Sequence, residues 1–220
     1  MIEMKNIRKS FPLDGEKKIV LDGISMKIED GEMVAVMGAS GSGKTTLLNI
    51  LGCLEEADEG TYLCNGQDIT NMKSSTMEQF RKNTISFVFQ QFALIGDETV
   101  GDNIALPLKA RNVPRAKRKQ IISSVADKLG IADQLKKKPA LISGGQQQRC
   151  AIARALVTDN PIILADEPTG ALDQKTGLEI MEILRELSRE GKTVIIVTHD
   201  EKVAGMADRI IRIEDGCLIS

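Results

Sequence analysis

The stretch MVAVMGASGSGKT, from Met33 to Thr45, decides the fold because an apolar run passes directly into a glycine-rich loop. The run Met33 to Met37 is typical of a buried strand. In the loop that follows, glycines let backbone N–H groups converge on phosphate oxygens, and a helix predicted to begin near Lys44 adds the partial positive charge of its N-terminus. The stretch therefore predicts a strand, a phosphate-binding loop and a helix, in that order.

Two side chains at the end of this loop have distinct predicted roles. Lys44 is expected to reach the β- and γ-phosphates of a nucleotide, and Thr45 to offer its hydroxyl to a Mg²⁺ ion that bridges the same phosphates. An ordinary glycine-rich turn is the alternative, and the strand pattern before the loop argues against it. The predicted nucleotide-binding residues of the loop are Gly38, Ala39, Ser40, Gly41, Ser42, Gly43, Lys44, Thr45 and Thr46.

A second apolar run, from Ile162 to Ala165, is followed by two acids, Asp166 and Glu167. The end of a buried strand is where an α/β sheet presents groups to a ligand at its carboxyl edge. There we expect Asp166 to hold Mg²⁺ through water, and Glu167 to orient or deprotonate the attacking water. An acidic pair at a strand end is by itself often the start of a solvated loop. The phosphate-binding loop upstream favours the catalytic interpretation.

His199, the only histidine, follows a third apolar run, Thr193 to Thr198. A lone histidine is more often a surface or packing residue, but after a buried strand it reaches the same sheet edge and suits a γ-phosphate contact. A helix predicted from Thr176 to Glu190, and closed by Gly191, separates this run from the preceding one. Strands that alternate with helices predict a parallel sheet, so the expected fold class is α/β.

The segment SGGQQQR, from Ser143 to Arg149, carries a second phosphate-binding pattern. A serine hydroxyl followed by two glycines at the start of a helix is an anion site built from backbone N–H groups and the helix dipole. One chain that binds one nucleotide has no use for two such sites. A head-to-tail pair with two-fold symmetry uses both, with each nucleotide between Gly38 to Thr45 of one copy and Ser143 to Gly145 of the other. A helix N-cap with a tight turn is the interpretation that would hold if the segment stood alone.

The remaining segments predict smaller elements around the parallel sheet. Runs from Met1 to Lys5 and from Lys18 to Ile28, with a strand that enters a turn at Asn65-Gly66, predict an antiparallel sheet in the first third of the chain. The other expected elements are a strand at 85–90, helices between about 101 and 141, and a last hairpin of 209–213 with 217–220.

Composition argues against several classes of function. With 29 basic against 31 acidic residues, no global charge favours nucleic acid, and we expect no nucleic-acid partner. The four cysteines form no CxxC pair, which is typical of reduced, packed thiols and not of a zinc site. No stretch approaches the ~18 consecutive apolar residues of a membrane span, and the N-terminus lacks the apolar region of a signal peptide, so we expect a cytosolic chain.

Along its whole length, the chain resembles the nucleotide-binding domain of ABC transporters. Seven motifs carry the resemblance in the family's order, and they match the adenine-stacking aromatic at Phe11, Walker A at Gly38 to Thr45, the Q-loop at Gln90, the signature at Ile142 to Gln146, Walker B at Ile162 to Glu167, the D-loop at Ala171 to Asp173 and the switch histidine at His199. The resemblance implies ATP as the nucleotide, with its adenine stacked on Phe11.

The same resemblance implies the remaining roles and the architecture. Gln90 would touch Mg²⁺ or the attacking water while tethering a helical subdomain. The implied catalytic residues are Glu167, His199, Lys44 and Gln90, the metal site is Thr45, Gln90 and Asp166, and the contacts to the nucleotide of a second copy are Ser143, Gly144, Gly145, Gln146 and Asp173. The implied fold is a P-loop NTPase of ABC type, with a mainly parallel sheet core, an N-terminal antiparallel β subdomain and an inserted helical subdomain. One domain would span 1–220, with a catalytic lobe of 1–90 and 145–220 and the helical subdomain at about 91–144.

Three motifs, FVFQQF, SGGQQQRCAIARAL and LADEPTGALD, look most like the stand-alone ATPases of the MacB and LolD type. That group implies a homodimer that closes on two Mg-ATP and drives export or extraction through a separate polytopic membrane subunit. It also implies a cytoplasmic protein that is peripheral on the inner face of the cytoplasmic membrane. Gly96-Asp97-Glu98 departs from the group's usual proline-leucine region, where the coupling helix of the partner would dock, so the resemblance leaves the identity of the partner open.

Other functions of the same ATPase remain open. A relative of the FtsE type has a similar sequence and does not transport. Soluble ABC ATPases of DNA repair or translation usually carry long coiled coils, zinc modules or tandem domains, and the segment between Gln90 and Ser143 is too short for a coiled-coil insertion. A P-loop kinase would leave the segment from Ser143 to Arg149 unexplained.

Overall fold

A mainly parallel sheet of buried strands forms the centre of the structure, a computed structural model that describes residues 1–13 and 15–219. Its strand order is β10-β9-β3-β8-β7-β6, and only β10 runs antiparallel to its neighbour. Every residue of β3 and β8 is buried, which explains why their sequences are continuous apolar runs. The strands are β3 (Met33–Met37), β6 (Ile85–Val88), β7 (Ile162–Asp166), β8 (Thr193–Thr198), β9 (Arg209–Glu214) and β10 (Cys217–Ile219).

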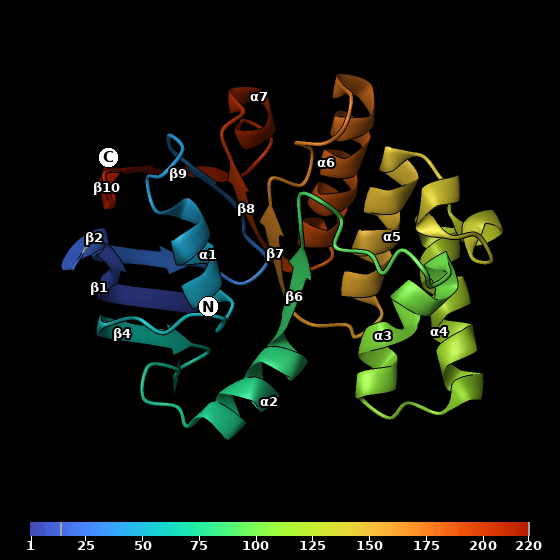
Figure 1. The fold of residues 1–220 in the computed structure, drawn as a ribbon, viewed down its shortest axis with the longest axis horizontal. Helices are drawn as coiled ribbons and strands as arrows, with labels where there is room; N and C mark the ends of the chain where they lie inside the picture. Colours follow the sequence, from blue (N-terminus) through green and yellow to red (C-terminus); the bar gives the residue numbers. More distant parts are fainter. Residues whose placement is uncertain (14, 220) are drawn as a thin grey trace.

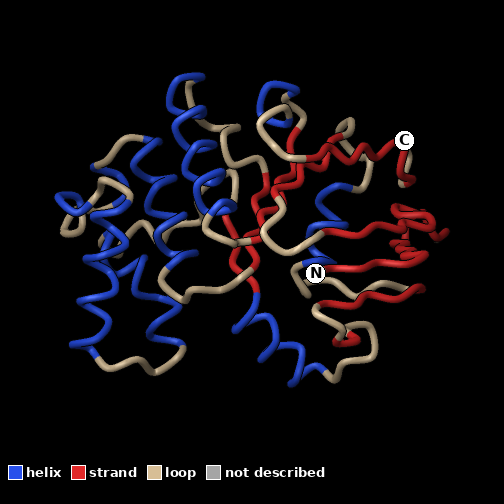
Figure 2. The backbone as a smooth tube through the Cα atoms, turned by 180° about the vertical axis from the view of Figure 1, so that it is seen from behind, coloured by secondary structure: helices blue, strands red, loops and turns tan. Residues whose placement is uncertain are grey.

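Alternate residues of the central strands pack into two separate cores. In β7, Ile162 and Leu164 belong to a core shared with α1 and the N-terminal strands, while Ile163 and Ala165 face a core built from α3, α5 and α6. The helices are α1 (Lys44–Leu51), α2 (Ser74–Thr84), α3 (Val100–Ala110), α4 (Arg115–Lys128), α5 (Gly144–Leu156), α6 (Gln174–Arg189) and α7 (Glu201–Ala204). Figure 1 shows the strand-rich part and the helix-rich part on opposite sides of β6 and β7, and Figure 2 shows the same division from behind.

The antiparallel sheet expected in the first third of the chain is confirmed. Its order is β2-β1-β4-β5, with β1 (Ile2–Leu13), β2 (Glu16–Ile28), β4 (Glu59–Cys64) and β5 (Gln67–Asp68). Both long strands extend further than the sequence predicts, so Phe11 lies within β1. Asn65 and Gly66 have φ values of 50° and 76° and form the predicted turn between β4 and β5.

The expected α/β class, with an antiparallel sheet and a group of helices beside a mainly parallel sheet, is confirmed, but two helices, α2 and the short α7, were missed. α2 has no buried residue in its polar sequence SSTMEQFRKNT, so the helical periodicity that marks α5 or α6 is absent. Between Gly101 and Leu141 the helices α3 and α4 are followed by two short 3₁₀ turns, Ala132–Gln134 and Pro139–Leu141. Of the final hairpin, Ser220 lies outside the described residues.

Within residues 1–13 and 15–219, none of the helices has both the length and the apolar character that a bilayer crossing demands.

We predict that Gly60→Ala lowers the free energy of unfolding by roughly 2–3 kcal/mol. Gly60 is the second residue of β4 and has φ +100°, and a Cβ there would lie 2.5 Å from the carbonyl oxygen of Asn6, where the pairing of β1 with β4 shifts register. Backbone strain and a backbone clash therefore act together. Urea unfolding measures the effect, with Gly96→Ala as the control because no atom lies within 4 Å of the added carbon there. Equal stability of the two variants would contradict the prediction.

Candidate functional site

The loop from Gly38 to Gly43 joins the carboxyl end of β3 to the N-terminus of α1. Gly41 and Gly43 have φ values of 82° and 101°, in the left-handed region that favours glycine. A Cβ on Gly43 would lie 2.7 Å from the carbonyl oxygen of Val20, so no side chain fits there. The β1–β2 hairpin thus packs directly against the loop.

The polar groups of this loop suit an anionic ligand. Lys44 is buried, and its Nζ donates to the carbonyl oxygens of Gly38 at 2.8 Å and Ala39 at 2.7 Å. Ser42 Oγ is buried and has no hydrogen-bond partner among the described residues. An unsatisfied buried hydroxyl costs about 1–3 kcal/mol. A phosphate oxygen would accept hydrogen bonds from such donors, so the loop fits the predicted nucleotide.

Glu167 and His199 form a direct pair at the carboxyl ends of β7 and β8. His199 Nδ1 lies 2.6 Å from Glu167 Oε1, and Thr198 Oγ1 donates to Glu167 Oε2 at 3.3 Å. Glu167 has a φ of 44°, which is strained for a residue with a side chain, while its N–H donates to the carbonyl of Val197. Strain of this kind is typical of functional sites. The sequence predicts both residues at this edge but not their contact with each other.

Asp166 ends β7 beside this pair and is unfavourably placed as an anion. Burial, and then the charge of Glu167, raise the pKa of its carboxyl above the usual range, and Lys44 opposes them. The charge of Asp166 is thus disfavoured by burial and by its neighbour Glu167, and Lys44 offsets it only in part. A divalent cation would relieve this imbalance, so the residues present fit the Mg²⁺ that the sequence predicts. Its candidate ligands Asp166 and Thr45 belong to β7 and to the first turn of α1.

Gln90 follows β6 and lies against the loop that leaves Glu167. A Cβ added to Gly170 would be 2.7 Å from Gln90 Nε2, so the glutamine side chain covers the Gly170 backbone. The structure thus places Gln90 beside the segment that begins with the acidic pair. This contact joins the loop after β6 to the loop after β7.

Ser143 is the N-cap of α5, so the capping interpretation holds within one chain. Its Oγ accepts from the N–H of Gln146 at 3.3 Å, and Gln146 Oε1 accepts from the N–H of Ser143 at 3.0 Å. A Cβ on Gly145 would lie 2.5 Å from Thr176 Cγ2. Asp173 caps α6 by accepting from the N–H of Thr176 at 3.0 Å. These residues form a second cluster where α5 and α6 begin.

Phe11 lies on β1 with 36% of its surface exposed. Lys9 Nζ is 5.2 Å from the centre of its ring. The ring is therefore accessible to a flat ligand, and the hairpin that carries it packs against Gly43 through Val20. This position is compatible with the predicted stacking on a base.

Sequence reasoning missed two contributors to the site, the Thr198 hydroxyl on Glu167 and the Gly170 backbone under Gln90. Thr198 carried a signal, because it directly precedes His199 at the end of a buried strand. The contact between Gly170 and Gln90 joins two distant segments of the chain. Ser42 was expected as a nucleotide-binding residue, and the structure adds that its hydroxyl is buried without a hydrogen-bond partner among the described residues.

Comparison with known proteins places this geometry in a family. Residues 21–170 match the family described as ABC transporter. The whole chain is 48% identical to the macrolide export ATP-binding/permease protein MacB of Shigella flexneri, of which it covers 34%. It therefore spans about a third of the length of such curated relatives.

Two solved structures are similar in fold. The ATP-binding cassette MJ0796, in a dimeric post-hydrolysis state bound to ADP and Pi, is 40% identical with a TM-score of 0.92, over 100% of this chain and 97% of that chain. The protein cbiO1 of Clostridium perfringens, part of the transporter complex cbiONQ, is 26% identical with a TM-score of 0.89, over 100% of this chain and 86% of that chain.

We predict that Asp166→Asn raises the free energy of unfolding at neutral pH by roughly 0.5–2 kcal/mol when no nucleotide is added. The raised pKa means that the folded state binds a proton at Asp166 more readily than the unfolded state does. Ionised Asp166 therefore weakens the fold at neutral pH, and this penalty is lost as the pH falls below the ordinary aspartate pKa of about 4.

Urea unfolding of parent and variant at neutral pH and near pH ~4 measures the effect, and the difference in stability should shrink in acid. Asp97→Asn serves as the control because Asp97 is fully exposed. A variant that is less stable than the parent at neutral pH would contradict the interpretation of Asp166 as an unfavourably placed anion.

Proposed function

Because this chain belongs to the ABC transporter family, we propose that it drives a membrane complex of the MacB or LolD type through a separate polytopic subunit. It is an ATPase of that family, which binds ATP and converts it with water to ADP and phosphate. The observation that carries the assignment of hydrolysis is the Glu167–His199 pair beside the phosphate-binding loop, and the likeness to MacB supports the membrane complex.

In the proposed reaction, Glu167 accepts the proton of the attacking water. The water oxygen forms the new bond to the γ-phosphorus, the bond from that phosphorus to the bridging oxygen breaks, and ADP keeps the electron pair. His199 and Thr198 fix the orientation of the carboxylate through their contacts of 2.6 Å and 3.3 Å. Lys44 and the N–H groups of the loop after Gly38 stabilise the charge on the phosphate oxygens.

Mg²⁺ would supply neutralisation of the phosphate charge, held by the Thr45 hydroxyl, the Asp166 carboxylate and the Gln90 amide. The raised pKa of Asp166 and the unpartnered Ser42 hydroxyl support a site built for a nucleotide with its cation. Phe11, exposed on β1, would stack on the adenine.

We infer that a second copy completes the site. The start of α5, with Ser143 exposed and Gly144 and Gly145 half-buried, would face the phosphates bound to the partner copy, and Gln146 and Asp173 would flank them. Leu141, directly before the signature, is 70% exposed and would be free to contact the partner copy. The two clusters of site residues within one chain then become two halves of one composite site.

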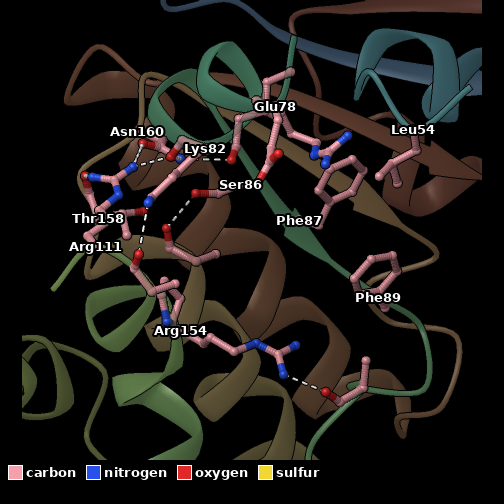
Figure 3. A pocket seen from close by; sticks show the side chains of 16 residues that line it. Leu54, Glu78, Lys82, Ser86, Phe87, Phe89, Arg111, Arg154, Thr158 and Asn160 are labelled. Atoms are coloured by element: carbon pink, nitrogen blue, oxygen red, sulfur yellow. Dashed lines mark hydrogen bonds between the residues drawn. The ribbon is translucent and has the colours of Figure 1, made fainter. Parts of the chain in front are cut away.

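The proposed membrane subunit docks in a groove of about 490 Å³ between α2, β6, α3 and the end of α5, shown in Figure 3. Leu54, Phe87 and Phe89 give it apolar walls, and the rings of the two phenylalanines stack with centroids 5.5 Å apart. The groove lies beside the loop of Gln90, where movement of a partner could reach the site.

The positive charge of the side chains that line the groove indicates that the docked segment carries acidic side chains. The groove is lined by four cations, Arg81, Lys82, Arg111 and Arg154, and by one acid, Glu78. The cations donate to backbone carbonyls, for example Arg111 to Thr158 and Lys82 to Ala110. Within residues 1–13 and 15–219 none of the four forms an ion pair, so an amphipathic segment with acidic side chains would complement their charge.

Localisation and domain organisation follow from this proposal. The chain would be cytoplasmic and peripheral on the inner face of the cytoplasmic membrane. Residues of about 91–144, which contribute α3 and α4, would form the helical subdomain between lobe segments 1–90 and 145–220. An FtsE-like complex that signals without transport would use the same groove. A transport assay with the assembled complex would distinguish a transporter from such a signalling complex.

We predict that Glu167→Gln lowers kcat for ATP hydrolysis by at least ~100-fold, because the amide cannot accept the proton of water. Binding of ATP should persist, and the variant should accumulate as an ATP-bound dimer. Phosphate release and size-exclusion chromatography with Mg-ATP measure the two effects. Glu186→Gln, on the exposed side of α6, controls for loss of a carboxylate. Hydrolysis at the parent rate by folded Glu167→Gln would refute the role of Glu167.

We predict that Leu54→Asp combined with Lys82→Glu abolishes capture of the membrane subunit. Both side chains are exposed in the groove, so the fold should tolerate the changes while acidic charge repels the docked segment. Tagged Glu167→Gln protein is incubated with detergent-solubilised native membranes and Mg-ATP, and the retained polytopic protein is quantified by mass spectrometry. Lys128→Glu is the control, since Lys128 lies on α4 outside the groove. Undiminished capture by the double variant would exclude this groove.

A further inference from the structure

We propose that Arg154 is a positioning residue that holds the loop carrying Gln90 in a strained conformation. The loop contains two consecutive residues with left-handed backbone, Phe92 at φ 60° and Ala93 at φ 48°. Neither residue is glycine, so the conformation is unfavourable for the isolated segment. Something outside the segment must therefore stabilise it.

The Arg154 guanidinium supplies that stabilisation. Its Nη2 donates to the carbonyl oxygen of Phe92 at 2.9 Å, and its Nη1 donates to the carbonyl oxygen of Ala93. Within the loop, the turn is closed only locally, by the N–H of Phe92 to Phe89 and of Ala93 to Gln91. Both carbonyls of the strained pair thus depend on one distant side chain.

Arg154 makes no ion pair among the described residues. Burial lowers the pKa of its guanidinium, yet the group stays charged at neutral pH. A desolvated cation without a carboxylate needs strong acceptors, and the two carbonyls provide them. Although Arg154 lies in the last turn of α5, its donors serve the loop after β6 and not the end of its own helix.

The contact connects both clusters of site residues. α5 begins at Gly144, next to Ser143, and carries Arg154 near its other end, while Gln90 precedes the strained pair and covers Gly170. Figure 3 shows Arg154 in the same groove as Phe89. The position of Gln90 therefore depends on α5 through Arg154. A partner bound in the groove could change that position. This inference rests on the proposed catalytic role of Gln90.

The test compares Arg154→Met with the same change in a protein whose loop is less strained. Arg154→Met should lower kcat about tenfold with little change in the KM for ATP, because misplacement of a reacting group acts on the chemical step. Adding Ala93→Gly should recover part of that loss, since glycine removes the strain at one of the two left-handed residues. Arg118→Met is the control, because Arg118 is also half-buried and also donates to a backbone carbonyl, that of Val113.

Hydrogen exchange of the peptide covering residues 89–95 gives a readout that does not depend on catalysis. Arg154→Met should raise its exchange about tenfold, and Arg118→Met should leave it unchanged. If Arg154→Met unfolds the protein, Arg154→Lys, which keeps the charge but loses the forked donors, is measured instead and should show a smaller effect of the same sign. Unchanged exchange in the variant would overturn the proposal even if ATP hydrolysis by the parent is confirmed.

Faster exchange with unchanged kcat would also overturn it, since the loop would then be held without positioning Gln90. A loss of kcat that Ala93→Gly fails to recover would assign Arg154 another role. If the parent hydrolyses no ATP, the proposed function fails, while the exchange measurement still decides whether Arg154 holds the loop.

Discussion

Parallel pairing of β3, β6, β7 and β8 is the constraint on which the rest of the structure depends. Because parallel strands present their carboxyl ends at one edge of the sheet, strand pairing alone brings the loops that follow them together. The phosphate-binding loop, Gln90, the acidic pair and His199 come from four such loops. Their encounter is a consequence of hydrogen bonding between strands that are far apart in sequence.

That edge is stable only because the two cores beneath it are extensive. The site itself contains features that weaken a fold, namely the desolvated Asp166, the strained backbone of Glu167 and the unpartnered Ser42 hydroxyl. Burial of both faces of β3, β7 and β8 offsets these unfavourable terms. Such a division between a strained site and a stable core is common in enzymes, since ligands complete what the protein alone leaves unsatisfied.

The helix α5 links the signature residues to the loop of Gln90 and to the groove. Its first turn carries the signature residues, and its last turn both reaches the loop of Gln90 through Arg154 and lines the groove with Phe87 and Phe89. Movement in the groove and closure around a nucleotide would therefore act on the same rigid body. A helix transmits displacement along its length because its backbone hydrogen bonds resist bending.

The sequence by itself determined the fold class, the order of the strands along the chain and the motif residues at the sheet edge. Short local sequence patterns predict buried strands, glycine loops and helix caps, as at Met33 to Thr45 and at Ser143. It missed α2, which buries no residue, and extended β1 and β2 too little. Only the tertiary structure decided that Glu167 contacts His199, that Gln90 covers Gly170 and that Arg154 holds the strained loop. Such contacts join residues from different segments, and side-chain geometry across a packed core leaves no periodic trace in the sequence.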